Sequence, residues 1–427
     1  MTNKRTVFLF GAGATLAWNS PTTSELTDLV RTSGFNCADN TTRITEFIYS
    51  TLLANGYPSR NVNFETIISV IEDLIIYYSK FDKDLPAESI SSVFLAPRYE
   101  KELLNYSIIG GAVKHGYELQ IPAGQDYPLS KRAYHGETPS QFFFEHLVSL
   151  LLTTVTARIH EYAYHTQSSL MKSVDDDISK LFVKWMKLFS GKSVLRLYTL
   201  NYERIFKILL ARAGLSVFEG FDCEEFVCDT LRANVPKIFN ETEGHVHYNL
   251  HGSAFWEVLD LDKEQLPNPE IVLSSIFTLP AGNGPVSLQI EKGKTLLVTN
   301  MITGYQKAQR GMITPFKQMQ AAFDRDCCLA DEVYVVGYSF GDEHINESLK
   351  TAVRHNPKLK ITIVDPQFIQ NKMDYELALH LFPFKQESHR AQRKVRNNVY
   401  SYFGNAFTVH TVGFREFLES QLSDASK

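Results

Sequence analysis

The chain has 427 residues, of which 44% are hydrophobic and 21% charged, so its composition is that of a globular protein and excludes wholesale disorder. The length predicts one large domain or two moderate ones. A balance of 43 Lys and Arg against 48 Asp and Glu gives a net charge of −5, which argues against general nucleic-acid binding. The five cysteines form no Cys-x-x-Cys pair, so we expect reduced thiols, no disulfide framework and no zinc ribbon.

Two apolar segments bear on where the protein is found. Residues 6–10 follow a short polar start, and because this run is too short for a signal peptide it predicts a buried strand. The most lipophilic window, 142–159, contains Glu145, His146 and Arg158, and therefore predicts a buried helix rather than a membrane span. We expect a soluble, cytoplasmic protein that does not contact a membrane.

Strand and helix patterns alternate along the chain. Thr22 and Glu25 have the spacing of a capping box and predict a helix start. Largely apolar runs predict buried strands at 6–10, 194–200, 247–250, 332–336 and 360–364. Helical periodicity appears at 62–77, twice within 141–190, and after the strands that end at 200 and 336. Residues 81–135 show no clear period, which is typical of an irregular insertion.

Strands that are apolar on both faces, each followed by a helix, predict an α/β fold with a parallel sheet covered on both sides. The polar and glycine-rich motifs all follow such strands. Because ligands of open α/β sheets bind at the carboxyl ends of the strands, we expect these motifs to converge although they lie far apart in the sequence.

The first of these motifs is Gly11-Ala12-Gly13-Ala14-Thr15, directly after the strand at 6–10. Glycines at this junction let backbone N–H groups approach a pyrophosphate closely. The sixth position of the dinucleotide fingerprint is Leu16 instead of glycine, so a tight turn without a ligand is an equally good interpretation.

Two polar residues end the next strands. Asn201 could cap the following helix, and a lone histidine such as His251 is more often structural than catalytic. His245 and His247 lie nearby, but no acidic or Cys partner has ligand spacing, so we expect no metal site.

Two further features have plain interpretations. Cys327 and Cys328 predict buried packing next to a strand. The basic run at 390–396 predicts a solvated helix face rather than a patch for nucleic acid or a partner.

Taken in order, four motifs resemble one family, the sirtuin-like NAD hydrolases of bacterial anti-phage defence. They are Gly-Ala-Gly-Ala-Thr at 11–15, Asn-Tyr-Glu at 201–203, His-Gly-Ser at 251–253, and Gly-Tyr-Ser-Phe-Gly-Asp-Glu-His-Ile-Asn at 337–346, which is the most specific. The resemblance implies a Rossmann-like sirtuin core over 1–80 and 190–375. It leaves 81–189 as an irregular or helical insertion and 376–427 as a C-terminal extension.

The resemblance also assigns roles to residues. It implies that Asn201 and His251 are catalytic, and that the remaining motif residues contact NAD. These NAD-binding residues are Gly11, Ala12, Gly13, Thr15, Gly252, Gly337, Ser339 and Asp365. The family has Asn-x-Asp where this chain has Asn201-Tyr202-Glu203, so the role of the acidic residue is open.

Protein-deacylating sirtuins carry an Asp-Phe-Arg loop and a four-cysteine zinc ribbon, and this chain has neither. We therefore expect an NAD⁺ glycohydrolase that releases nicotinamide and ADP-ribose. A non-catalytic NAD or ADP-ribose sensor, an assembly subunit and an NAD-dependent deacylase are the alternatives.

The resemblance implies a companion protein, namely a translocase ATPase, an Argonaute-type protein or a nucleotide-processing enzyme. The apolar residues Phe142, Phe143, Phe144, Leu150, Leu151, Phe182 and Trp185 favour a homo-oligomer or a docking face, although a helical layer packed on its own sheet is the alternative.

Overall fold

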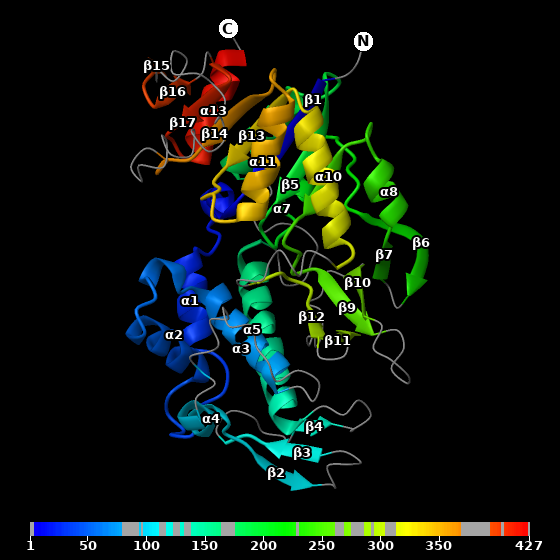
Figure 1. The fold of residues 1–427 in the computed structure, drawn as a ribbon. Helices are drawn as coiled ribbons and strands as arrows, with labels where there is room; N and C mark the ends of the chain where they lie inside the picture. The colour runs from blue at the N-terminus through cyan, green and yellow to red at the C-terminus, as the bar shows by residue number, and fades with distance from the viewer. Residues whose placement is uncertain are drawn as a thin grey trace.

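The computed structural model describes residues 4–78, 94, 97–110, 117–122, 129–131, 138–163, 176–227, 230–260, 269–274, 286–291, 294–303, 313–368, 393–402 and 405–425. An eight-stranded sheet forms its centre, in the order β15-β16-β17-β14-β13-β1-β5-β8 (Figure 1). The strands are β1 (Lys4–Phe10), β5 (Ser193–Thr199), β8 (Val246–Asn249), β13 (Glu332–Val336), β14 (Lys360–Val364), β15 (Arg393–Arg396), β16 (Val399–Tyr402) and β17 (Phe407–His410).

Six of these strands, from β8 to β17, pair in parallel. The predicted α/β class and parallel sheet are therefore confirmed. The sequence could predict this sheet because a parallel sheet is covered on both faces, and its central strands are therefore apolar at successive positions. Every residue of β5 is buried, and so are the last five of β1.

Helices cover both faces of this sheet. On one face lie α6 (Asp177–Lys187), α7 (Ile205–Arg212) and α13 (Phe414–Ala425), where Phe8 meets Trp185 edge to face at 5.3 Å between ring centroids. On the other lie α10 (Phe316–Leu329) and α11 (Glu343–His355), and there Tyr198 contacts Phe323 at 4.8 Å. Cys327 is buried within α10, as predicted, and Cys328 is only half-buried.

A buried carboxylate ties α10 to the sheet. Asp326 is fully buried and accepts hydrogen bonds from Arg196, Arg5, Arg325 and the hydroxyl of Tyr198. Arg196 also donates to the main-chain oxygens of Gly244 and Glu241 at 2.8 and 2.7 Å. A buried charge with this many donors is satisfied, and removing it would leave buried guanidinium groups without compensation.

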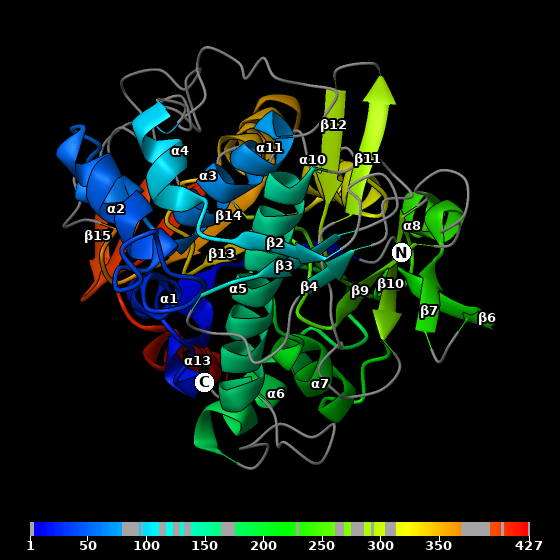
Figure 2. The same ribbon diagram turned by 90° about the horizontal axis from the view of Figure 1, so that it is seen from below.

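A helical lobe, formed by α1 (Thr23–Arg31), α2 (Ile44–Ala54), α3 (Phe64–Tyr77) and α5 (Pro139–Ala163), lies below the sheet in Figure 1. The N-terminus of α1 has the predicted capping box between Thr22 and Glu25. Helix α5 packs along α3 and runs through the middle of the molecule in the view from below (Figure 2). Its segment Pro139–Tyr162 is long and apolar enough to cross a membrane, but 61% of its most apolar window is buried inside the protein.

The apolar residues between Phe142 and Trp185 that favoured a docking face pack mainly inside the protein. All of them are buried except Leu150, which is 38% exposed. Phe143 contacts Phe35, and Trp185 contacts Phe417, so these side chains fill the helical lobe and the sheet core. The interpretation as an exposed docking face was wrong for the six buried residues, and the alternative of helical layers packed within the chain describes them.

Smaller elements complete the description. The 3-10 helices are η1 (Ala12–Trp18) and η2 (Ser59–Asn61), and α4 (Pro97–Leu103) and α8 (Val235–Asn240) are short. A three-stranded sheet contains β2 (Ser107–Gly110), β3 (Tyr117–Gln120) and β4 (Leu129–Lys131). A four-stranded sheet contains β6 (Phe221–Val227), β7 (Thr230–Ala233), β9 (Trp256–Asp260) and β10 (Pro269–Ser274), and β11 (Val286–Glu291) pairs with β12 (Lys294–Val298).

The domain boundaries expected at residues 80, 190 and 375 stay predictions, and contacts cross two of them. Helix α3 packs on α5 across the first boundary, and β17 pairs with β14 across the last. The described part of the basic run, 393–396, is strand β15 rather than a helix face. The described pieces of 81–135 include the three-stranded sheet, which the pattern did not predict.

Candidate functional site

The sheet brings the predicted motifs to one edge. Strands β8, β5, β1, β13 and β14 are consecutive neighbours and all run parallel, so the segments that follow them emerge side by side. From β1 the chain first adds strands on the β5 side and later on the β13 side. This reversal makes the β1–β13 junction a topological switch point, where open α/β sheets bind their ligands.

The glycine loop after β1 packs directly on the end of β13. The N–H of Gly11 donates to the Val336 carbonyl and that of Gly13 to the Gly337 carbonyl, both at 2.9 Å. A Cβ on Gly11 would lie 2.5 Å from the Gly337 oxygen, and one on Gly13 would lie 2.8 Å from the Gly337 Cα. The glycines are therefore required for main-chain contact between the two loops, and these two N–H groups are engaged within the protein.

The other loop residues differ in exposure. Ala12 is exposed, while Thr15 is buried and its hydroxyl contacts the Ser20 hydroxyl at 3.1 Å. Ala12 and Gly13 are thus the parts of the loop that can face a ligand, and Thr15 supports the loop from beneath.

Asn201 joins this loop to the end of β5. Its side-chain nitrogen donates to the Gly11 carbonyl at 3.1 Å, and to the Thr15 hydroxyl and a Glu203 carboxyl oxygen at 3.4 Å. All three contacts use the amide nitrogen, so the amide oxygen is the group that can orient a ligand hydroxyl or a water. Asn201 is 8% exposed, and its three hydrogen bonds show that it anchors the glycine loop to the end of β5.

Glu203 is a buried carboxyl beside Asn201. Burial raises the pKa of Glu203 to about 7, against hydrogen bonds from Asn201 and Tyr162 that favour the charged form. Desolvation dominates because a carboxylate loses its hydration in this environment. Glu203 therefore changes charge near neutral pH next to the candidate catalytic amide.

The loops after β5 and β8 are interlocked by main-chain oxygens. The Asn249 side chain donates to the carbonyls of Asn201 and Glu203 at 2.9 and 3.1 Å. The carbonyl of Tyr202 accepts from the Ala254 N–H at 2.9 Å and from the Ser253 hydroxyl at 3.0 Å. Any movement of the Asn201 loop must therefore involve the loop that carries His251.

His251 is 3% exposed and lies between the β5 loop and segment 299–303. Its main-chain carbonyl accepts from the Ile302 N–H at 2.8 Å. Gly252, with φ +86°, pairs with Met301 at a point where a Cβ would overlap the Asn300 carbonyl. The His251 ring is 5.7 Å from the His344 ring, centroid to centroid, so helix α11 also reaches this place.

The 337–346 motif folds largely on itself. The Tyr338 hydroxyl donates to the Asp342 carbonyl at 3.0 Å and contacts Asn346 at 3.1 Å, which closes the loop before α11. Ser339, in the same loop, is exposed to solvent. Asp365, after β14, accepts from the Gln367 N–H at 2.8 Å, and partial burial raises its pKa.

The helical lobe contacts these loops through side chains of α3 and α5. Glu65 of α3 accepts from the Tyr202 hydroxyl, Tyr162 of α5 hydrogen-bonds Glu203, and His160 of α5 hydrogen-bonds the main chain at Ala254. Burial lowers the pKa of His160 to about 4, so this ring is neutral at physiological pH.

Sequence reasoning missed Tyr202, His344, Glu65 and segment 299–303. Tyr202 and His344 lie inside the motifs at 201–203 and 337–346, and their position in these motifs is the only signal that could have identified them. The others are more than 40 residues from their partners in the rest of the chain and carry no local signal. Among the residues that the structure describes, no three His, Cys, Asp or Glu side chains gather closely enough to hold a metal ion, and the absence of a metal stays a prediction.

No protein-family model matches the chain, and no curated protein does. Solved structures that resemble it include a Sir2 homologue in complex with NAD, which is 11% identical with a TM-score of 0.37 over 98% of this chain and 88% of the other. A mutant Sir2 homologue in complex with ADP-ribose is 12% identical with a TM-score of 0.33, over 90% of this chain and 96% of the other. Likeness at this level does not establish a shared activity.

Proposed function

We propose that the protein is an NAD⁺ glycohydrolase that releases nicotinamide and ADP-ribose at the edge formed by the ends of β1, β5, β8 and β13. The observation that carries this proposal is the convergence of the ordered motifs. Residues from 11–15, 201–203, 251–253 and 337–346 follow parallel strands at one sheet edge, at the switch point.

The chemistry needs only what this edge offers. Nicotinamide leaves NAD as a neutral molecule from a cationic ring, so its departure needs no general acid. The protein must stabilise the ribosyl cation that forms and place a water to attack it. The Asn201 amide oxygen can orient that water or a ribose hydroxyl, and the His251 imidazole can take up the proton. The bond to nicotinamide breaks, the bond from water to the ribose carbon forms, and the water proton is released.

The alternative favoured by a specific observation is a sensor that binds NAD or ADP-ribose without turnover. Asn201 and His251 are 8% and 3% exposed, and both belong to tightly held loops. A deacylase is a weaker alternative because the chain lacks the cysteine ribbon of that class.

One assay separates these functions. The purified protein is incubated with NAD, with and without an acylated peptide, and nicotinamide is measured. Release without peptide supports the glycohydrolase, release only with peptide indicates a deacylase, and binding without release indicates a sensor.

The biological role follows as part of the same proposal. A cytoplasmic enzyme that destroys NAD would harm its host if it were always active, so we place it as the NAD-depleting effector of an anti-phage defence system. A companion protein or an infection signal would then raise its rate, in an oligomer whose interface lies elsewhere than the buried apolar residues of α5 and α6. NAD hydrolysis at full rate by the isolated monomer, unchanged by the product of the neighbouring gene, would contradict this role.

A further inference from the structure

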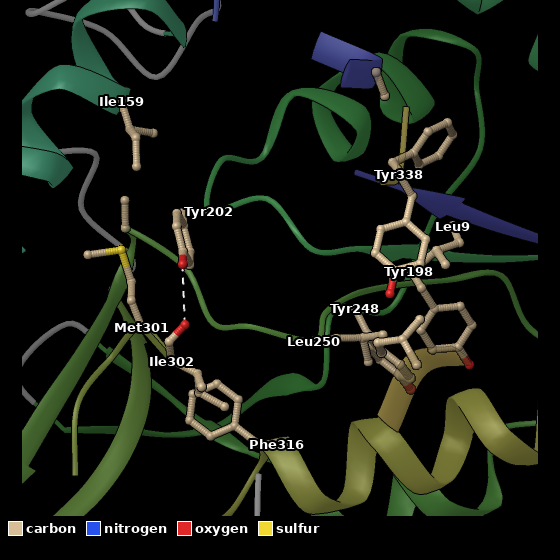
Figure 3. Close-up of a cluster of buried hydrophobic side chains, with 14 of the residues drawn as sticks. Leu9, Ile159, Tyr198, Tyr202, Tyr248, Leu250, Met301, Ile302, Phe316 and Tyr338 are labelled. Atoms are coloured by element: carbon tan, nitrogen blue, oxygen red, sulfur yellow. Dashed lines mark hydrogen bonds between the residues drawn. The ribbon is translucent and has the colours of Figure 1, made fainter. Parts of the chain in front are cut away.

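One phenol lies between the helical lobe and the segment that supports His251. The Tyr202 hydroxyl is 3.2 Å from a carboxyl oxygen of Glu65 in α3 and 3.2 Å from the main-chain oxygen of Ile302. Figure 3 shows this side chain directed at Ile302, beside Met301 and below Ile159 of α5. Tyr202 is 8% exposed, and burial raises its pKa well above the usual value, so the phenol is a donor.

The Ile302 main chain continues the connection. Its carbonyl accepts from Tyr202, and its N–H donates to the His251 carbonyl at 2.8 Å. The same segment pairs with Gly252 through Met301, and the Asn300 carbonyl accepts from the Ser253 N–H at 3.2 Å. Whatever fixes segment 299–303 therefore also fixes the main chain from His251 to Ser253.

A phenol has one proton, and two acceptors face it at the same distance. A carboxylate accepts a hydrogen bond more strongly than a neutral carbonyl, so a Glu65 carboxylate at the same distance competes with Ile302 for this proton.

We propose that Tyr202 is a positioning residue for His251, acting through the Ile302 main chain, and that Glu65 of the helical lobe opposes it by competing for the same hydroxyl proton. This rests on the proposed NAD hydrolysis for its kinetic consequences, but the hydrogen-bond competition itself does not depend on that activity.

A double-mutant cycle tests it. Because one hydrogen bond is lost, Tyr202→Phe is expected to lower kcat for NAD about 3- to 10-fold with little change in KM. Glu65→Gln is expected to raise kcat in the wild-type background and to have no effect in the Tyr202→Phe background, because it acts only through the hydroxyl. An unchanged or lowered kcat in Glu65→Gln, or the same effect in both backgrounds, overturns the competition.

The matched control is Tyr248→Phe, the same change on the neighbouring strand β8. The Tyr248 hydroxyl is buried, and no described residue hydrogen-bonds it, so this variant should keep wild-type kcat. A loss in Tyr248→Phe as large as that in Tyr202→Phe would mean that removing any buried hydroxyl here impairs the enzyme, and would overturn the specific role of Tyr202.

A second measurement is independent of NAD turnover. Amide hydrogen exchange within 251–254 and 300–303 should be faster in Tyr202→Phe, slower in Glu65→Gln and unchanged in Tyr248→Phe. If the wild-type protein does not hydrolyse NAD, the proposed function fails, whereas this pattern of exchange still supports the positioning role. Unchanged exchange in Tyr202→Phe overturns it.

Discussion

Gly337→Ala distinguishes two reasons for the glycines at this edge. If they only make room for a ligand, the variant should unfold like the wild type when no NAD is present. The structure predicts otherwise, because a Cβ at Gly337 would lie closer than 3.0 Å to the Ala14 nitrogen and to the main chain of Gly13. Gly337 also has φ +60°, a conformation that costs an L-residue roughly 1–2 kcal/mol.

Main chain meets main chain here, so the overlap cannot be relieved by a side-chain rotation. Overpacking of this kind costs roughly 1–3 kcal/mol, and together with the φ cost we expect a loss of about 2–5 kcal/mol in the free energy of unfolding. Urea unfolding of the ligand-free protein measures it. The control is Gly341→Ala in the same motif, where the nearest atom to a Cβ is the Ser339 hydroxyl oxygen at 3.7 Å. Equal stability of Gly337→Ala and wild type would refute the reasoning, as would equal losses in both variants.

Three further predictions concern the site and the core. Asn201→Ala and His251→Ala should each reduce NAD hydrolysis ~10²–10⁴-fold in a folded protein, checked by nicotinamide release together with circular dichroism. Because the pKa of Glu203 rises from 4.5 in an exposed glutamate to about 7 on burial, the folded state loses stability as pH rises through that interval. Glu203→Gln should remove about 3 kcal/mol of this pH dependence of the free energy of unfolding, which urea unfolding at pH 5 and pH 8 measures. If the free energy of unfolding falls between these two pH values as much in the variant as in the wild type, the prediction is contradicted. Asp326→Ala should destabilise the protein by about 3–5 kcal/mol, since it leaves buried arginines uncompensated, and a loss below 1 kcal/mol in urea unfolding would show that the cluster is not needed.

The sequence predicted the centre of the sheet better than its edge, for a physical reason. Strands β1 and β5 are buried on both faces, so their composition alone identifies them. Strand β15 is an edge strand that contains Arg393, Lys394 and Arg396, and charges are typical of edges because they prevent further pairing. The same residues are compatible with a solvated helix, so the sequence pattern could not distinguish an edge strand from a helix.

The site divides in the same way. That Asn201 and His251 lie at the same edge could be predicted because each follows an apolar strand, and parallel strands end at a common edge. Their catalytic roles stay predictions. The partners of Tyr202 could not, because Ile302 and Glu65 are 100 and 137 residues away in the sequence. The buried residues of α5 show a related limit, since an excess of apolar residues says that a surface will be covered but not by what.

The edge that carries the candidate chemistry also carries main-chain contacts on which the fold depends. Gly13 and Gly337 are in contact, and Asn201 bonds the glycine loop. A variant at any of these residues can therefore lose activity by two routes, loss of a chemical group or movement of a loop. A lost activity supports a chemical role only when unfolding and hydrogen exchange remain at wild-type values. For Asn201 the sharper change is Asn201→Asp, which keeps the size but replaces the amide donor with a carboxylate facing the Gly11 carbonyl and Glu203. If the amide is needed to hold the loop, this variant should be less stable than Asn201→Ala, and the gap should widen above pH 7, where Glu203 is charged.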